Sequence, residues 1–317
     1  MGRIAFRDLH GLVLLDKPLG LSSNQALQAA RRLFRAAKGG HTGALDPLAT
    51  GLLPLCFGEG TKIAGQLLGS RKAYLAECRL GTTTTTADLE GEVIAERAVP
   101  ELSDTLIEAA LQPFRGRIAQ VPPVYSAIKQ GGEALYLKAR RGETVEVPAR
   151  EVEIHRLELV AREGNRLVLR VECGSGTYIR SLAVDIGEAL GCGAHLCSLR
   201  RLWVEPFLEP QMVTLEQIEQ AAGQGDTRLL ALMRPVGEGL AHLPAVPLDA
   251  VASQALSRGQ RVQLDPSVAP VGRCAAYGDD GALLALAECD AQGWLRVLRG
   301  FNLPPPLPLI EAGRPPS

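Results

Sequence analysis

The chain has 317 residues with almost balanced charge, 34 Lys and Arg against 35 Asp and Glu, and 46% of its residues are hydrophobic. Such a composition is ordinary for a globular protein with a well-buried core, in one large domain or two. No apolar run approaches the ~20 residues that a membrane helix needs, and the N-terminus lacks the apolar core of a signal peptide. We therefore expect a cytoplasmic protein that does not enter membranes.

The seven cysteines are odd in number, scattered and without a CxxC pair, which indicates reduced thiols. Cys192, His195 and Cys197 are close enough to suggest one corner of a zinc site, but no second ligand pair follows, so we expect no metal. Residues 1–150 carry 19 basic and 15 acidic side chains, whereas residues 151–317 carry 15 and 20. A basic N-terminal part can bind phosphate even when the whole chain is nearly neutral.

The N-terminal elements follow from local patterns. Gly11–Leu15 is predicted to be a strand, and Ser22 or Ser23 caps a helix that runs to about Ala37. We expect Gly39-Gly40 to end this helix.

Further along the chain, strands are predicted at Leu52–Phe57 and Lys72–Leu80, with a helix between them that runs through Leu68. Ser103 is expected to cap a helix that ends near Leu111. Pro122-Pro123 opens a basic, glycine-hinged insertion over residues 122–150 that we expect to protrude.

The next segment is predicted to be a β-hairpin formed by Val152–Val160 and Leu167–Cys173. A helix over Tyr178–Leu190 and a strand over Leu196–Val204 follow, and then a helix from about Thr214 to Ala222. From Pro247 onward, one short helix and several strands indicate a small β-rich appended domain.

The stretch His41–Leu53 places Asp46 on a turn bounded by Gly43 and Pro47, between a basic helix and a hydrophobic run. A loop can there present an acid to a substrate while apolar walls exclude water. The alternative is that Asp46 only makes a turn hydrogen bond before Pro47.

A carboxylate is a suitable nucleophile toward a sugar carbon that bears a base. Burial would raise the pKa of Asp46, and a guanidinium such as Arg180 would lower it by roughly 1–3 units. Tyr74 can stack on a flat ring, and stacking worth ~1–3 kcal/mol would offset much of the cost of extruding an RNA base. The structural alternatives are a surface arginine and a core aromatic residue.

Several ordered motifs carry a family resemblance. They are Gly11–Pro18 with Ser22-Ser23, Gly40–Gly51, Arg71–Tyr74, Tyr125–Lys129, Gly176–Arg180, and Gly191–Leu196 with Leu199–Arg201. Over about residues 10–220 the chain closely resembles the TruB family of tRNA pseudouridine synthases.

The resemblance implies an α+β fold with a mixed, largely antiparallel central sheet flanked by helices, and a small C-terminal barrel-like domain of PUA type. The implied organisation is a catalytic domain over 1–240 with a thumb-like RNA-binding insertion at 122–150, a PUA-like domain at 247–303 and a proline-rich tail at 304–317.

By matching position, the resemblance implies Asp46 as the catalytic nucleophile, Tyr74 as the aromatic residue stacked on the flipped uracil, and Arg180 as the ion-pair partner of Asp46. His41 would hold the flipped T-loop, and Tyr178 and Leu199 would line the uridine site. The candidate RNA contacts are Lys17, Lys129, Arg140, Arg141 and Arg200.

The implied reaction is conversion of uridine-55 to pseudouridine in the T-loop of tRNA, by a monomer that needs no cofactor and no metal. Thr85 stands where many relatives place an acidic residue, Asp88 is retained, and the stretch 223–246 matches no motif. Two alternatives remain, a non-catalytic tRNA-binding or tRNA-folding protein and a metal-dependent hydrolase using His41 and Asp46. The hydrolase lacks a third ligand and the HxE and PCxxC pattern of deaminases.

Overall fold

The computed structural model describes residues 5–126, 129–134, 141, 143, 145 and 147–304. The strands of its main sheet are β1 (Gly11–Lys17), β2 (Gly39–His41), β3 (Ala49–Phe57), β4 (Lys72–Leu80), β7 (Gly116–Gln120), β10 (Arg150–Glu163), β11 (Arg166–Cys173) and β12 (Ala194–Val204). Two hairpins lie outside this sheet, β5 (Thr82–Thr84) with β6 (Val93–Glu96) and β8 (Lys129–Gln130) with β9 (Glu133–Ala134).

The helices are α1 (Ser23–Phe34), α2 (Ala64–Leu68), α3 (Asp104–Leu111), α5 (Ile179–Ala189), α6 (Leu215–Gln224), α7 (Asp226–Leu230) and α8 (Ala250–Ser257), with 3-10 turns η1 (Gly58–Ile63), η2 (Gln112–Phe114) and η3 (Val236–Leu240). A second sheet contains β13 (Ala245–Pro247), β14 (Val262–Gln263), β15 (Gly272–Tyr277), β16 (Leu283–Cys289) and β17 (Trp294–Gly300). None of the helices in the described part of the chain combines the length and the apolarity that a membrane crossing requires.

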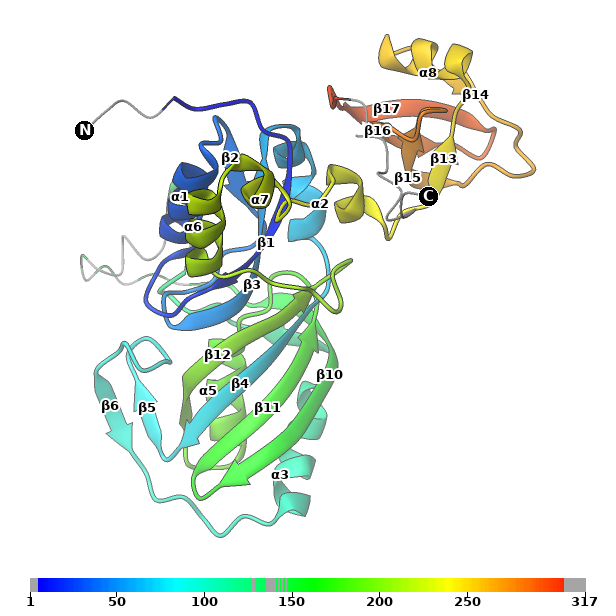
Figure 1. The fold of residues 1–317 in the computed structure, drawn as a ribbon. Coiled ribbons are helices and arrows are strands. Elements are labelled where there is room, and N and C mark those ends of the chain that lie inside the picture. Colours follow the sequence, from blue (N-terminus) through cyan, green and yellow to red (C-terminus); the bar gives the residue numbers. More distant parts are fainter. Residues whose placement is uncertain are drawn as a thin grey trace, which may run out of the picture.

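The main sheet has the strand order β1-β3-β12-β4-β11-β10-β7, with β2 added to β3. Its pairs are antiparallel except for β12 and β3, which run parallel over three residues. The second sheet curls beside the first, above α2 in Figure 1, in the order β13-β15-β16-β17-β14. The expected α+β class with a largely antiparallel central sheet is therefore confirmed.

Local capping explains where the first helix begins and ends. Ser22 and Gln25 form a capping box at the start of α1, as Ser or Thr at the N-cap predicts. The helix ends at Phe34, because Arg35 adopts a left-handed conformation with a φ of 54° and its N–H bonds back to the last turn. The prediction that the helix reaches Ala37 and is ended by Gly39-Gly40 is wrong, since these glycines begin β2.

Two hydrophobic cores lie on opposite faces of the main sheet. Val13 and Leu15 of β1 belong to the core beneath α1, α5 and α6, whereas Leu12 and Leu14 belong to the core shared with η1, η3 and the second sheet. The alternation of side chains along a strand produces this division. The β1–β3 half of the sheet is therefore covered on both faces.

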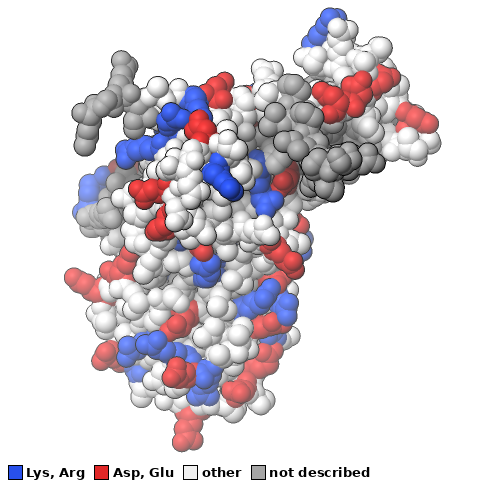
Figure 2. Space-filling model, in the orientation of Figure 1, with Lys and Arg blue, Asp and Glu red and all other residues white. Residues whose placement is uncertain are grey.

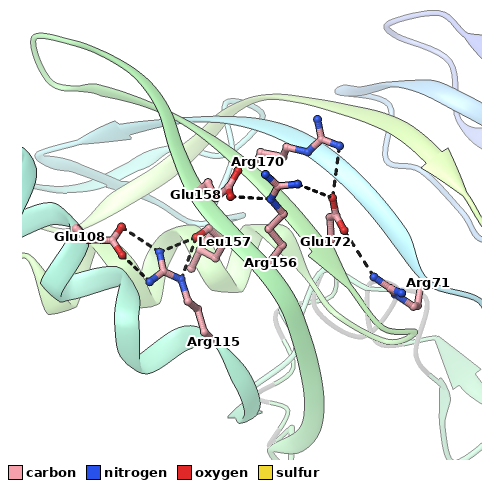
Figure 3. A network of polar contacts seen from close by, with 8 residues as sticks. All are labelled: Arg71, Glu108, Arg115, Arg156, Leu157, Glu158, Arg170 and Glu172. Atoms are coloured by element: carbon pink, nitrogen blue, oxygen red, sulfur yellow. Dashed lines mark hydrogen bonds and ion pairs between the residues drawn. The ribbon is translucent and has the colours of Figure 1, made fainter. Parts of the chain in front are cut away.

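The other half of the sheet is covered on one face by α3 and α5 and exposed on the other. Figure 3 shows this exposed face, where Glu172 lies among Arg71, Arg156 and Arg170 at 3.4–3.7 Å. Over these strands basic and acidic side chains are interspersed in Figure 2. Such exposed ion pairs contribute little to stability each, so the open face depends on the packing beneath it.

The second sheet is joined to the first by polar and apolar contacts. Lys62 Nζ donates to the Gly300 carbonyl oxygen at 2.8 Å, and the Asn302 amide donates to Glu59 Oε2 at 2.7 Å. Phe301 is buried in the core that contains Leu12. The domain boundaries expected from the sequence stay predictions, and the tail beyond residue 304 lies outside the described residues.

The parallel pairing of β3 with β12 depends on Gly51, whose φ is +94°. A Cβ at this position would overlap the backbone of Arg201 on β12. We predict that Gly51→Ala lowers the free energy of unfolding by more than about 2 kcal/mol, because strain and overlap add. Gly65→Ala is the control, since Gly65 lies in α2 with open space around its Cα. Equal stability of the two variants in urea unfolding would contradict this prediction.

Candidate active site

The loop that carries Asp46 is fixed on both sides by hydrogen bonds. The Ser23 hydroxyl accepts from the Leu45 amide at 2.7 Å and donates to the Leu45 carbonyl oxygen at 3.0 Å. The Gly20 amide donates to the Pro47 carbonyl oxygen at 2.9 Å. Ser23 was expected only as a helix cap, and its role here depends on a contact across 22 positions that local pattern does not reveal.

Arg180 lies at the start of α5, where Tyr178 is the N-cap residue. The Gln120 side chain bonds both the amide and the carbonyl of Tyr178, at 2.8 and 3.1 Å, which fixes the first turn. Arg180 Nη2 lies 3.0 Å from Asp46 Oδ2 and donates to the Tyr125 carbonyl oxygen at 2.9 Å. The predicted ion pair between Asp46 and Arg180 is present.

Asp88 is a second carboxylate on the same guanidinium. Arg180 Nη1 lies 3.4 Å from Asp88 Oδ2 and donates to the Thr86 carbonyl oxygen at 3.2 Å. Only 2% of the Asp88 side chain is exposed, and the other carboxylate oxygen accepts from the Thr86 hydroxyl and the Glu90 amide. The sequence showed that Asp88 is retained but gave no signal of this contact.

A cavity of about 240 Å³ opens above the ion pair, and its lining includes Asp46, Tyr74, Tyr178, Arg180 and Leu199. Five residues expected at the site from distant parts of the chain therefore meet in one place. The cavity contains both polar and apolar walls, with Tyr74 buried and Asp46 at its open side. A single flat ring can lie against Tyr74 within reach of the carboxylate.

The Asp46 side chain is 47% exposed. The expectation that apolar walls exclude water from this carboxylate is therefore wrong for the unliganded protein, because the cavity is open on one side. Burial nevertheless raises the pKa of Asp46, the Arg180 charge lowers it, and the nearby Asp88 charge raises it again, leaving a pKa above the ordinary value.

Arg201, and not Arg200, points into the cavity. Arg201 is buried, its Nε donates to the Leu52 carbonyl oxygen at 2.6 Å, and its Nη2 donates to the Gly43 carbonyl oxygen at 3.1 Å. Arg200 donates two hydrogen bonds to the Asp16 carboxylate, at 2.7 and 3.0 Å, and does not line the cavity. Side chains alternate between the two faces of a strand, so Leu199 and Arg201 share one face of β12. This alternation would have predicted Arg201, and not Arg200, as the cavity residue.

Lys17 lies behind the Asp46 loop and not in the cavity lining. It is fully buried, and its Nζ donates to the carbonyl oxygens of Pro18 and Leu21 at 2.8 and 2.5 Å. Burial lowers the pKa of Lys17 to about 8, and the Asp46 charge opposes this shift. Lys17 holds the turn after β1 and adds positive charge near the carboxylate, but it does not reach the surface as an RNA contact would.

His41 lies on β2 outside the cavity lining. Its Nδ1 is buried and has no hydrogen-bond partner among the described residues. Burial and the Arg201 charge both lower the pKa of His41, which favours the neutral ring.

The insertion is only partly described. Arg140 and the side chain of Lys129 lie outside the described residues. Arg141 pairs with Glu133 at 2.6 and 2.8 Å and with Glu143 at 2.7 Å. At the suggested zinc corner, His195 Nδ1 lies 2.9 Å from the Thr82 carbonyl oxygen and Cys197 Sγ lies 3.8 Å from His195 Nε2. The described residues contain no group of three or more potential metal ligands.

Comparison with known structures agrees with this fold. One similar structure is a Cbf5-Nop10-Gar1 complex, with a TM-score of 0.70, 26% identity, and coverage of 92% of this chain and 80% of that chain. Another is an H/ACA RNP bound to a substrate RNA containing 2'-deoxyuridine, with a TM-score of 0.72, 24% identity, and coverage of 93% of this chain and 86% of that chain. At this identity the similarity establishes a shared fold and nothing more.

Two proteins are more similar to this chain in sequence than these structures are. The tRNA pseudouridine synthase B of Xanthomonas axonopodis pv. citri (strain 306) is 58% identical over 95% of this chain and 96% of the relative. The protein of that name from Xylella fastidiosa (strain Temecula1 / ATCC 700964) is 57% identical over 96% of this chain and 99% of the relative.

Family models cover the centre of the chain. The N-terminal domain of the TruB family of pseudouridylate synthases matches residues 31–179, and the C-terminal domain of tRNA pseudouridylate synthase B matches residues 180–241. The second match extends into the stretch 223–246, which showed no motif, so that most of this stretch belongs to the family pattern. The chain is therefore a member of the TruB family of pseudouridylate synthases.

Proposed function

We propose that this protein isomerises uridine-55 to pseudouridine in the T-loop of tRNA, acting as a monomer on the T-arm. The names of the relatives support tRNA as the substrate. The observation that carries the proposal is the Asp46–Arg180 pair at 3.0 Å on the wall of a cavity that also contains Tyr74.

The reaction breaks the bond between C1′ and N1, turns the uracil, and joins C1′ to C5. N1 gains a proton and C5 loses one. The target uridine must leave its stack to enter the cavity, which costs a few kcal/mol, and stacking on Tyr74 offsets much of this. Tyr178 and Leu199 line the same cavity and bound the ring.

Asp46 can attack C1′, add to the uracil ring, or abstract a sugar proton, and each role requires the ionised carboxylate. Arg180 stabilises that ion and is itself held by Asp88 and two backbone carbonyls. The bound nucleoside would close the open side of the cavity and so supply the shielding from water that the free protein lacks.

Replacing Asp46 tests the proposal directly. Because joining C1′ to C5 expels the C5 hydrogen, tritium at C5 of the target uridine is released by the wild type. We expect Asp46→Asn to lower the rate of release by about 10³-fold or more, with little change in RNA affinity. The control is Asp104→Asn, at an acid that is 84% exposed. Equal release from wild type and Asp46→Asn would overturn the assignment.

The pH dependence tests the role of Asp88. Since the ionised carboxylate is active, kcat/KM should fall as the pH drops through the pKa of Asp46, which lies above its ordinary value of 3.8. Asp88→Asn removes a like charge, so we expect the acid limb to move to lower pH, while kcat falls about 10–100-fold because Arg180 loses one fixed partner. An acid limb that stays in place or moves to higher pH would contradict this assignment.

The insertion is proposed to contact phosphates. We expect replacement of Arg140 and Arg141 by Ala to weaken RNA binding and to flatten the plot of log affinity against log salt by roughly one unit for each arginine that contacts phosphate. The counterpart is Glu133→Gln combined with Glu143→Gln, since the two changes remove both carboxylates that pair with Arg141 and should strengthen binding. An unchanged slope in filter-binding titrations would mean that this insertion does not touch phosphate.

A further inference from the structure

Ala87 adopts a left-handed backbone conformation between two groups that hold Arg180. Its φ is 62°, and among the described residues Arg35 is the other non-glycine residue with a positive φ. Arg35 follows the last turn of α1, where this conformation is common. Ala87 lies between β5 and β6, and the left-handed region costs free energy for a residue with a Cβ. Such a cost persists only where the surroundings impose the conformation.

The turn at Ala87 directs two acceptors toward one nitrogen. The Thr86 carbonyl oxygen accepts a hydrogen bond from Arg180 Nη1 at 3.2 Å, and Asp88 Oδ2 lies 3.4 Å from the same nitrogen. Because peptide bonds are planar, the two backbone dihedral angles of Ala87 set how the Thr86 carbonyl is oriented relative to the peptide that enters Asp88. The conformation of Ala87 therefore decides whether both acceptors reach Arg180 together.

Hydrogen bonds on both sides of Ala87 impose this conformation. The Ala87 amide donates to the Thr84 carbonyl oxygen at 3.2 Å, and the Ala87 carbonyl oxygen accepts from the Leu196 amide at 3.0 Å. The Thr84 hydroxyl donates to the Asp88 carbonyl oxygen at 2.7 Å. Leu196 belongs to β12, the strand that also carries Leu199 of the cavity wall. The sheet that shapes the cavity thus holds the turn as well.

The side chain of Ala87 has space around it. Ala87 is half-buried and lines a hollow of about 260 Å³ that also contacts α5 and the segment from Val121 to Tyr125. A moderately larger residue at this position therefore meets little steric opposition, and its backbone preference decides whether the turn forms. Substitutions of Ala87 can thus test backbone conformation separately from packing.

We propose that Ala87 is a positioning residue of the reaction, which acts through its left-handed backbone and not through its side chain. It presents the Thr86 carbonyl and Asp88 together, and so fixes the Arg180 guanidinium in the orientation that holds Asp46. Ala87 does not itself line the cavity of the candidate site. The inference rests on the proposed function, because it concerns the geometry of the Asp46–Arg180 pair.

The test compares two residues of similar size and polarity that differ in backbone preference. Asn adopts the left-handed conformation readily, whereas β-branched Thr does not. The substrate is T-arm stem-loop RNA carrying tritium at C5 of the target uridine, and Ala87→Asn should keep the wild-type kcat. Ala87→Thr should lose about 10-fold in kcat with KM unchanged, because the surfaces that bind RNA are intact.

Two further measurements separate positioning from general destabilisation. In the Asp88→Asn background, Ala87→Thr should cost clearly less in kcat than it does alone, since residues that act as a unit do not contribute independently. Glycine adopts the left-handed conformation without the cost of a Cβ, so Ala87→Gly should melt at or above the wild-type temperature. The melting measurement does not depend on whether Ala87→Thr folds.

The inference is overturned if Ala87→Asn and Ala87→Thr have the same kcat, or if the losses of Ala87→Thr and Asp88→Asn multiply in the double variant. It is also overturned if Ala87→Gly melts below the wild type, because the turn would then not be under strain. Failure of the proposed function has a different signature, since the wild type would then release no tritium from this RNA.

Discussion

The site depends on one buried guanidinium that is shared by two carboxylates. A buried cation is stable only when its hydrogen-bonding capacity is satisfied, and Arg180 achieves this with Asp46, Asp88 and the carbonyls of Thr86 and Tyr125. These partners come from three segments that are far apart in the sequence. The geometry of the candidate site therefore exists only when all three segments and α5 are in place, which makes the site a property of the whole fold.

The central strands bring the remaining groups to this point. In the parallel pairing of β3 with β12, Leu199 lies opposite Ala49, three residues after Asp46. The antiparallel pairing of β12 with β4 places Arg201 opposite Tyr74. Gly51 permits the close approach of these strands. The sheet thus positions Tyr74 and Arg201, helix α5 positions Arg180, and a short anchored loop positions Asp46, an arrangement that favours precise chemistry.

The same arrangement leaves unsatisfied groups in and near the proposed site. Asp46 faces an open cavity with a raised pKa, and His41 Nδ1 is buried without a partner among the described residues. Each of these lowers the stability of the free protein. Such losses are typical of binding sites, because an RNA that supplies the missing donors, charge and shielding gains the corresponding free energy.

The sequence alone determined the elements and the identity of the central acid. Caps such as Ser22, the hairpin of β10 and β11, and the ordered motifs around Asp46, Tyr74 and Arg180 are local signals, and the structure contains each of these elements. Tertiary structure decided the rest. The end of α1, the pairing of Ser23 with Leu45, the choice of Arg201 over Arg200 and the contact of Asp88 with Arg180 all depend on which distant segments become neighbours. Local pattern cannot specify these contacts, because the free energy that selects them arises only when strands pair and side chains are buried together.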